Sequence, residues 1–336
     1  MKNRLIGLDW LRGFCAISIM FFHFGGGYDK TNTLMKLGIY GVSIFFILSG
    51  LSMAIVYNSF FKNINSYFDF FRRRIFRIVP LHFIACILML GITSTSKDFD
   101  ILDFILNITM LFGFIDHDNY IVVGAWSIGN EMVYYSLTPF VIILYNKNKI
   151  FGNIILLIST LIGMYFAFSI LDSNKSIESQ WSNYINPLNN LFLFIAGIAL
   201  YYNFENIKIK NQTLYIILIL SITTFLTIPY KSQLSICTGI ERISFCLISI
   251  LLVLCFYKIQ IKKNNRISYI FEIFGISTYG VYILHPIIND YLEIILNKGV
   301  LTKLIAVPTT ILIAILSYYY FEKKIIEFGK KLIGNV

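Results

Sequence analysis

The sequence predicts an all-α protein: a polytopic transmembrane helical bundle of about ten spans with both termini in the cytoplasm. The composition is the first reason, because 57% of the 336 residues are hydrophobic and only 14% are charged, far from the mixture of a soluble domain. The second is that apolar runs of membrane-spanning length, about 17–25 residues, recur from one end to the other. The third reason is that most lysines and arginines lie in short loops between these apolar runs, as they do in membrane proteins. Together they indicate a multi-pass protein of the cell (plasma or inner) membrane.

Ten segments are expected to cross the bilayer, namely 5–24, 38–57, 76–94, 124–145, 150–171, 187–203, 213–229, 240–258, 273–293 and 300–321. The segment 101–115 is too short for a confident span and is expected to be interfacial or re-entrant. Neither an internal repeat nor a long linker is visible. We therefore predict one membrane domain, 1–336, ending in a short cytoplasmic tail from about 322 to 336.

The basic residues orient these spans. If 101–115 does not cross, nineteen of the 28 lysines and arginines lie in loops on the side assigned to the cytoplasm, eight lie on the opposite side, and Arg12 lies within the membrane. This asymmetry follows the positive-inside rule. The net charge of +10 is thereby read as a topology signal, and no nucleic-acid partner is expected. Membrane lipid is expected to surround the protein. The sequence does not decide between a monomer and a homo-oligomer.

Cysteine and histidine give no sign of a metal or disulfide framework. The five cysteines lie inside apolar runs without a CxxC pair, which is typical of small buried hydrophobic side chains. The four histidines are scattered, without the spacing of metal ligands. No bound metal is therefore expected.

The first apolar segment, 5–24, carries ionisable residues that are costly within a bilayer and so indicate a functional site. Arg12 and His23 are eleven residues apart, which places them on one face of a helix and about 16 Å apart along its axis. His23 is a candidate general base, because a near-neutral imidazole can accept a proton from a hydroxyl group. The alternative role for His23 is that of a structural residue held by hydrogen bonds. Arg12 is a candidate for binding an anion or stabilising charge, or for pairing with Asp9.

A basic cluster precedes the third span and consists of Arg72, Arg73, Arg74 and Arg77. Arg74 and Arg77 share a helix face, and guanidinium groups bind phosphate oxygens in a bidentate manner. The cluster is therefore a candidate cytoplasmic site for a phosphorylated donor. The alternative role for the cluster is to anchor the cytoplasmic end of the span by contacting anionic lipid, as the positive-inside rule describes.

Two further constellations are expected near the outer side. Glu131 is the only carboxylate between Asp118 and Asp172, within the stretch Trp126-Ser127-Ile128-Gly129-Asn130-Glu131 that precedes Tyr135. At membrane depth it should face a cavity or a partner, where it would orient an imidazole, bind a sugar hydroxyl or support helix packing. His285, followed by Pro286, brings a second imidazole to the outer end of a late span.

These segments resemble the motifs of the acyltransferase 3 family of membrane acyltransferases. The family's opening signature is an Arg or Lys, ten residues and then a His, and Arg12 and His23 fit it. The other similar stretches are FFILSG (Phe45 to Gly50), RRRIFRIVP (Arg72 to Pro80), WSIGNE (Trp126 to Glu131) and YGVYILHP (Tyr279 to Pro286). Trp10 and Met132 depart from the common pattern. The motifs follow the family's order across nearly the whole chain, without an appended SGNH-type hydrolase domain.

The resemblance implies an O-acyltransferase of the EC 2.3.1 type. It would move an acyl group, usually acetyl, from cytoplasmic acetyl-CoA or another acyl-CoA to a hydroxyl of an extracytoplasmic or lipid-linked carbohydrate, most commonly a bacterial surface polysaccharide. It implies catalytic roles for His23, Arg12 and Glu131 and donor binding by the four arginines. The expected acceptor side consists of Trp126, Ser127, Tyr135 and His285.

Two other functions fit the same residues. Intramembrane polar residues also line the path of a transporter or flippase for a lipid-linked glycan, which would change only the location of its substrate. A non-catalytic scaffold or sensor would keep its function without Arg12 and His23. Release of free CoA in the presence of an acceptor distinguishes the acyltransferase.

Overall fold

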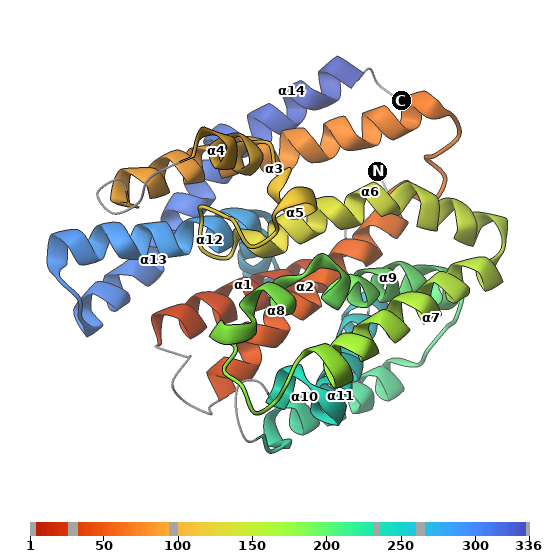
Figure 1. Cartoon of the computed structure of the whole chain (residues 1–336). Helices are drawn as coiled ribbons and strands as arrows, with labels where there is room; N and C mark the ends of the chain where they lie inside the picture. The colour runs from red at the N-terminus through yellow and green to blue at the C-terminus, as the bar shows by residue number, and fades with distance from the viewer. Residues whose placement is uncertain (1–4, 26–32, 94–99, 231–234, 260–265, 334–336) are drawn as a thin grey trace. The chain divides into compact units, whose positions relative to one another are not determined.

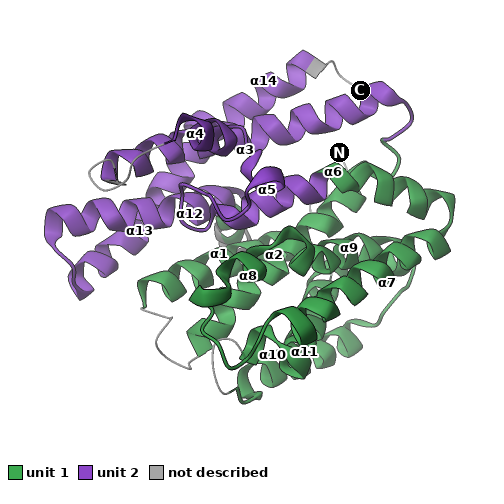
Figure 2. Cartoon of the chain, viewed as in Figure 1, with its two compact units in different colours: residues 1–60, 136–275 green, residues 61–135, 276–336 purple. Residues whose placement is uncertain are grey.

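The computed structural model describes residues 5–25, 33–93, 100–230, 235–259 and 266–333. These residues form helices and no strands, which confirms the predicted all-α class. Figure 1 shows the helices, and Figure 2 shows their division into two compact units. Unit 1 comprises Met1–Phe60 and Ser136–Gly275, and unit 2 comprises Phe61–Tyr135 and Ile276–Val336. Helices α6 (Ala125–Lys147) and α12 (Arg266–Leu296) each contribute residues to both units.

Besides its parts of α6 and α12, unit 1 contains the long helices α1 (Ile6–Phe24), α2 (Thr33–Tyr57), α7 (Lys149–Tyr165), α9 (Pro187–Phe204), α10 (Asn211–Thr227) and α11 (Gly239–Lys258). Its short elements are η1 (Phe166–Ile170), η2 (Glu178–Gln180), α8 (Trp181–Ile185) and η3 (Ser235–Cys237). Helix α2 packs against α1, α9 and α11. It is therefore the central helix of this unit.

Glycines allow α2 and α9 to cross with their backbones in contact. A Cβ atom added at Gly50 would overlap the carbonyl oxygen of Phe194, and one added at Gly197 would overlap the carbonyl oxygen of Ile47. Small residues are the usual means by which membrane helices approach this closely. The segment FFILSG thus ends in the glycine that the crossing requires.

Two buried cations tie other helix ends of unit 1 together. Lys36, near the start of α2, donates hydrogen bonds to the carbonyl oxygens of Phe225, Leu226 and Ile228 at 3.1, 3.0 and 2.7 Å, at the end of α10. A cation is stabilised there because the last carbonyls of a helix carry partial negative charge. Arg242 donates to the carbonyl oxygen of Asn189 at 2.7 Å. The contact of Lys36 joins two helix ends that the predicted topology places on the same side.

Besides its parts of α6 and α12, unit 2 contains α3 (Ile64–Thr93), α4 (Ile101–Ile108), α5 (Phe112–Ile115), α13 (Val300–Ser317), η4 (Tyr318–Glu322) and α14 (Lys323–Ile333). Two tyrosines of α12 join it to α3. Tyr279 donates to the carbonyl oxygen of Ile78 at 2.8 Å, and Tyr291 donates to that of Leu88 at 3.1 Å. Both pairs advance in the same direction, so α3 and α12 run parallel, as the predicted topology requires.

The segment 101–115 is broken into α4 and α5, and neither helix is long enough to cross a membrane. Met110, between them, has a φ of +62°, in the left-handed region that interrupts a helix. The buried side chain of Asn107 donates to the carbonyl oxygen of Asn119 and accepts from the backbone N–H of Ile121, at 2.9 and 2.8 Å. It thereby holds the following loop against α4.

Among the described residues, seven helices are long and apolar enough to cross a membrane, or eight if the bent pair α8 and α9 forms one span. The predicted count of ten is not confirmed. Three predicted spans account for the difference, namely 124–145, 187–203 and 213–229. The first corresponds to α6, which carries polar residues along its length. The second corresponds to α9, which meets α8 at a 45° bend, and the third corresponds to α10, which has 17 residues. Lys2, Arg4, Lys30, Lys97, Lys231, Lys262 and Lys263, which also entered the topology argument, lie outside the described residues.

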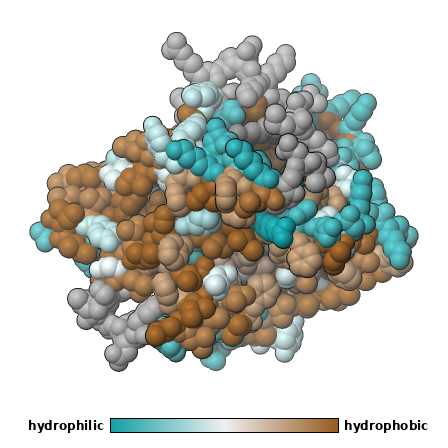
Figure 3. All heavy atoms as spheres, turned by 90° about the horizontal axis from the view of Figure 1, so that it is seen from above, coloured by the Kyte–Doolittle hydropathy of each residue, from teal (hydrophilic) through white to brown (hydrophobic). Residues whose placement is uncertain are grey.

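Large apolar side chains are exposed along α7 and α10, including Leu157, Leu161, Ile216 and Ile219. Figure 3 shows apolar residues over much of one face. Such surface is expected where lipid, and not water, surrounds the helices. All five cysteines are buried and free, which confirms the interpretation made from the sequence.

Candidate active site

The predicted site residues fall in both compact units. Arg12 and His23 belong to unit 1, whereas the arginine cluster, Trp126, Ser127, Glu131, Tyr135 and His285 belong to unit 2.

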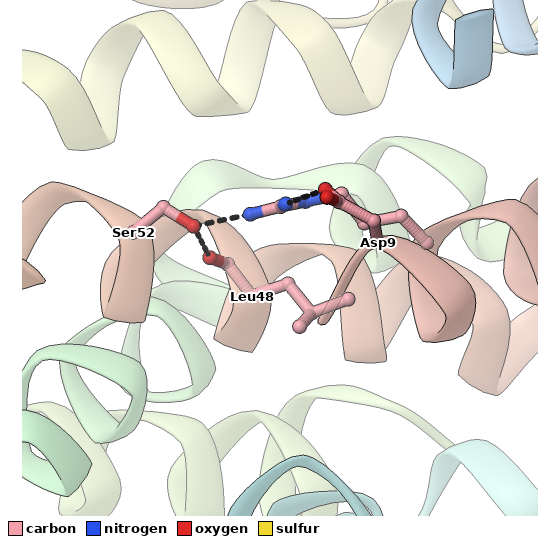
Figure 4. Close-up of polar contacts among 4 residues, drawn as sticks. Asp9, Leu48 and Ser52 are labelled. Carbon is pink, nitrogen blue, oxygen red and sulfur yellow. Dashed lines mark hydrogen bonds and ion pairs between the residues drawn. The ribbon is translucent and has the colours of Figure 1, made fainter. Parts of the chain in front are cut away.

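The guanidinium group of Arg12 contacts residues of two helices (Figure 4). Nη1 of Arg12 donates to Oδ1 of Asp9 at 3.0 Å, and Nη2 of Arg12 donates to the hydroxyl oxygen of Ser52 on α2. We call Asp9, Arg12 and Ser52 the Arg12 centre. Ser52 in turn donates to the carbonyl oxygen of Leu48. The side chain of Asp9 is 6% exposed and that of Arg12 is 24% exposed. The guanidinium charge is therefore paired and oriented, while part of the group stays accessible.

Close packing on both sides immobilises this centre. Ser52 follows by two residues the glycine crossing of α2 with α9, so the backbone that carries its hydroxyl is fixed. On the other side, a Cβ atom added at Gly275 of α12 would overlap Asp9. The pairing of Asp9 with Arg12 confirms one of the alternatives weighed from the sequence, and it leaves a role for Arg12 in chemistry open.

His23 lies near the end of α1 and is half-buried, with its ring edge-on to that of Phe22 at a centroid distance of 5.2 Å. Helix α1 is continuous from Ile6 to Phe24, so Arg12 and His23 share a helix face about 16 Å apart along the axis. Ala16 and Ile19, which lie between them on this face, are buried. The two polar groups therefore mark the two ends of a packed stretch and do not touch.

The arginine cluster lies on α3, and its members differ in exposure. Arg72 has a side chain that is 59% exposed and lies 3.7 Å from Oδ1 of Asp69. Arg73 and Arg74 are half-buried, and Arg77 is exposed. The cluster thus presents accessible guanidinium groups, which is what binding of a soluble anion requires.

Tyr135 connects this cluster with Glu131. The hydroxyl of Tyr135 donates to Oε2 of Glu131 at 3.0 Å, one turn away on α6. The guanidinium of Arg74 lies 5.8 Å from the centroid of the Tyr135 ring, within the range of a cation–π interaction. Phe70 of α3 also meets this ring edge-on. The structure therefore brings Tyr135 and, through it, Glu131 next to Arg74, although the first two were expected near the outer side and Arg74 on the cytoplasmic side.

A second meeting point in unit 2 is Tyr282 of α12. Its hydroxyl lies 2.7 Å from that of Ser127 and donates to the carbonyl oxygen of Gly124 at 3.0 Å. Gly124 has a φ of +84°, a conformation that favours glycine. The rings of Tyr282 and His285 lie 6.2 Å apart. His285 is buried, with Nδ1 3.1 Å from the carbonyl oxygen of Val281, and Trp126 is buried beside Ser127. The hydroxyl of Ser127 is therefore engaged at the start of α6.

Ser52 and Tyr282 were not predicted as parts of these polar groupings. Tyr282 belongs to the segment YGVYILHP, and its place in that segment was the available signal. Ser52 carries no such signal, since it becomes significant only through Arg12, 40 residues away in the sequence. Within the described ranges, no group of three or more His, Cys, Asp and Glu side chains is arranged to hold a metal ion.

Comparison with known proteins gives one match. The family model of the acyltransferase domain, of the acyltransferase 3 type, covers residues 5–320 and so runs through both compact units. No curated protein and no solved structure matches the chain. Because the family model covers nearly the whole sequence, this chain belongs to the acyltransferase 3 family of membrane acyltransferases.

Proposed function

We propose that this protein is an O-acyltransferase of the EC 2.3.1 type in the cell membrane, with both termini in the cytoplasm. It takes an acyl group, in the first instance acetyl, from cytoplasmic acyl-CoA and transfers it to a hydroxyl of an extracytoplasmic or lipid-linked carbohydrate, such as a bacterial surface polysaccharide. The observation that carries this proposal is helix α1. One continuous helix of spanning length carries an anchored, partly accessible Arg12 and a half-buried His23 on the same face.

The proposed chemistry needs a base, a group that positions the donor and a site for the donor phosphates. His23 accepts the proton of the acceptor hydroxyl while the hydroxyl oxygen forms a bond to the thioester carbonyl carbon. The C–S bond breaks, and the proton passes from His23 to the departing CoA thiolate. Arg12, oriented by Asp9 and Ser52 and about 16 Å along the helix axis from His23, positions the donor. An acyl-His23 intermediate would use the same residues in two steps.

The groups of unit 2 supply the remaining roles. The four arginines Arg72, Arg73, Arg74 and Arg77 bind the phosphates of CoA, which stay on the cytoplasmic side because they cannot enter the bilayer. Glu131 accepts a hydrogen bond from Tyr135, whose ring lies beside Arg74, and so assists the transfer next to the donor site. Trp126, Ser127 and His285 shape that side, with Ser127 and His285 both placed against Tyr282.

The experiment that tests this function compares wild type, His23→Ala and the matched control His117→Ala, a histidine in the loop after α5. Cells receive isotopically labelled acetate, membrane expression is equalised, and ester groups on surface glycan are read by NMR. We expect esters with wild type and the control and a loss of at least about 100-fold with His23→Ala, the range of general-base catalysis. Equal activity of His23→Ala would refute the mechanism. Glycan export without esters would identify a transporter.

A further inference from the structure

The guanidinium group of Arg242, in the first turn of α11, is buried with an incomplete set of partners. Nη2 of Arg242 donates to the carbonyl oxygen of Asn189 at 2.7 Å and lies 3.5 Å from Oδ1 of Asn190. The guanidinium carbon lies 5.7 Å from the centroid of the Phe192 ring. Nη1 is buried and has no hydrogen-bond partner among the described residues, and Arg242 as a whole is only 4% exposed. One nitrogen of a buried cation therefore lacks the acceptor that burial normally requires.

The charge of Arg242 is not balanced by a carboxylate within the described part of the chain, where no ion pair includes this residue. Glu241 precedes Arg242 in the sequence, but successive side chains on a helix point about 100° apart. The groups that Arg242 does contact, a carbonyl, an amide and an aromatic ring, are all neutral. Buried charges are normally paired with an opposite charge. The surroundings of Arg242 therefore favour a bound anion.

Lys36, the other buried cation in this part of unit 1, shows what Arg242 lacks. Lys36 lies 5.5 Å from the ring of Phe245, about one turn after Arg242 on α11, and donates to three carbonyl oxygens at the end of α10. A helix C-terminus carries partial negative charge, which stabilises a cation. Arg242 instead joins the first turns of α9 and α11, where the partial charge is positive, and α11 begins without a side-chain cap at Thr238. Both helix ends therefore add to the attraction for an anion.

The aromatic residues of α8 indicate the depth of this junction in the membrane. The rings of Trp181 and Tyr184 lie 5.5 Å apart, and both residues are half-buried. The carbonyl oxygen of Tyr184 accepts a hydrogen bond from the side chain of Asn189 at 2.7 Å, which holds α8 against the first turn of α9. Tryptophan and tyrosine are enriched at the boundary between membrane and water. In the proposed topology this boundary is the outer one, where the phosphate groups of lipids lie.

We propose that Arg242, together with the first turns of α9 and α11, binds the phosphate group of a lipid-linked carbohydrate acceptor. This inference rests on the proposed function and narrows its acceptor to one that carries a phosphate at the outer boundary. Nη1 of Arg242 donates to a phosphate oxygen, as guanidinium groups commonly do. Helix α11 packs against α1, so this site and His23 belong to the same group of helices. Arg242 holds the acceptor and takes no part in the chemical step.

The test measures binding of radiolabelled farnesyl phosphate to the full-length protein in an uncharged detergent, with unlabelled competitors. Wild type is expected to bind farnesyl phosphate at least about tenfold more tightly than the uncharged alcohol farnesol, the effect of a hydrogen bond to a charged group. Arg242→Gln should weaken binding of farnesyl phosphate by about the same factor and leave that of farnesol unchanged. The control is Lys175→Gln, which removes one positive charge from an exposed residue in the loop before η2 and should bind as wild type does.

Equal affinity of wild type for farnesyl phosphate and farnesol would overturn the inference, and this result needs no variant to fold. Unchanged binding by Arg242→Gln with a wild-type melting temperature would overturn it as well. Competition by phosphatidylglycerol as strong as that by farnesyl phosphate would identify a phospholipid as the occupant, and strong competition by inorganic phosphate would identify a site for the free ion. Either result would contradict binding of the acceptor. Ester formation by wild type tests the proposed function separately and does not depend on these outcomes.

Discussion

The arginine of the Arg12 centre in unit 1 and the arginines of the cluster in unit 2 differ in their polar partners and in their exposure. Arg12 has two direct polar partners on two helices, and the helices around it touch through glycines. In the cluster, Arg72 and Arg77 are exposed and Arg74 is half-buried, with an ion pair at 3.7 Å beside Arg72 and an aromatic ring beside Arg74. The guanidinium of Arg12 is therefore held in place, whereas those of Arg72 and Arg77 are accessible to a ligand.

The largest effect on the Arg12 centre is expected from a change at the crossing of α2 with α9. In Gly50→Ala the new methyl group would overlap the carbonyl oxygen of Phe194, so we expect a loss of about 3 kcal/mol, the upper end of the usual range for an overpacked contact. The measurement is the melting temperature and yield of the detergent-solubilised protein. Gly299→Ala is the matched control, because nothing lies within 4 Å of a Cβ there and the φ of −179° suits any residue. Equal stability of both variants would show that the crossing is not needed.

A second test separates the structural and chemical roles of Arg12. Asp9→Asn leaves the guanidinium without its charged partner and should cost about 1–3 kcal/mol of stability, less than for a fully buried pair because Arg12 is 24% exposed. The double variant Asp9→Asn/Arg12→Gln removes both charges and should regain most of this stability while remaining inactive. Melting temperature and ester formation are measured on the same membranes. Activity in the double variant at more than about a tenth of wild type would exclude a role for the Arg12 charge in catalysis.

The smallest effect is expected at the link between Arg74 and Glu131. Tyr135→Phe removes the hydroxyl that donates to Glu131 and keeps the ring beneath Arg74. One lost hydrogen bond to a charged group should lower kcat about tenfold, with little change in the KM of the donor. Tyr135→Leu removes the ring as well and should also raise that KM. If both variants change KM and kcat alike, the hydroxyl and the ring do not act separately.

Much of the fold could be predicted from local properties of the chain. Helix α1 appears within one residue of the predicted 5–24, and the break of 101–115 into two short helices agrees with its expected failure to span. The number of spans was not confirmed where hydropathy is interrupted. Helices are present at the predicted 124–145 and 187–203, as α6 and α9, but α6 carries polar residues along its length and α9 meets α8 at a 45° bend.

The candidate site was only partly predictable. The shared face of Arg12 and His23 follows from helical periodicity alone, since both residues lie on one element. The bond of Arg12 to Ser52 joins residues 40 positions apart, and that of Ser127 to Tyr282 joins residues 155 apart. Contacts of this kind depend on how helices pack, which periodicity along one helix does not encode.

By itself, the sequence determined the all-α class, the membrane character, the polar face of α1 and the family, because hydropathy, helical period and motif order are properties of consecutive residues. That Gly50 and Gly197 bring α2 and α9 into backbone contact, and that Tyr135 joins Arg74 to Glu131, depended on the tertiary packing. The physical reason is that packing and electrostatic interactions act over distances of a few ångströms in space, whatever the separation along the chain.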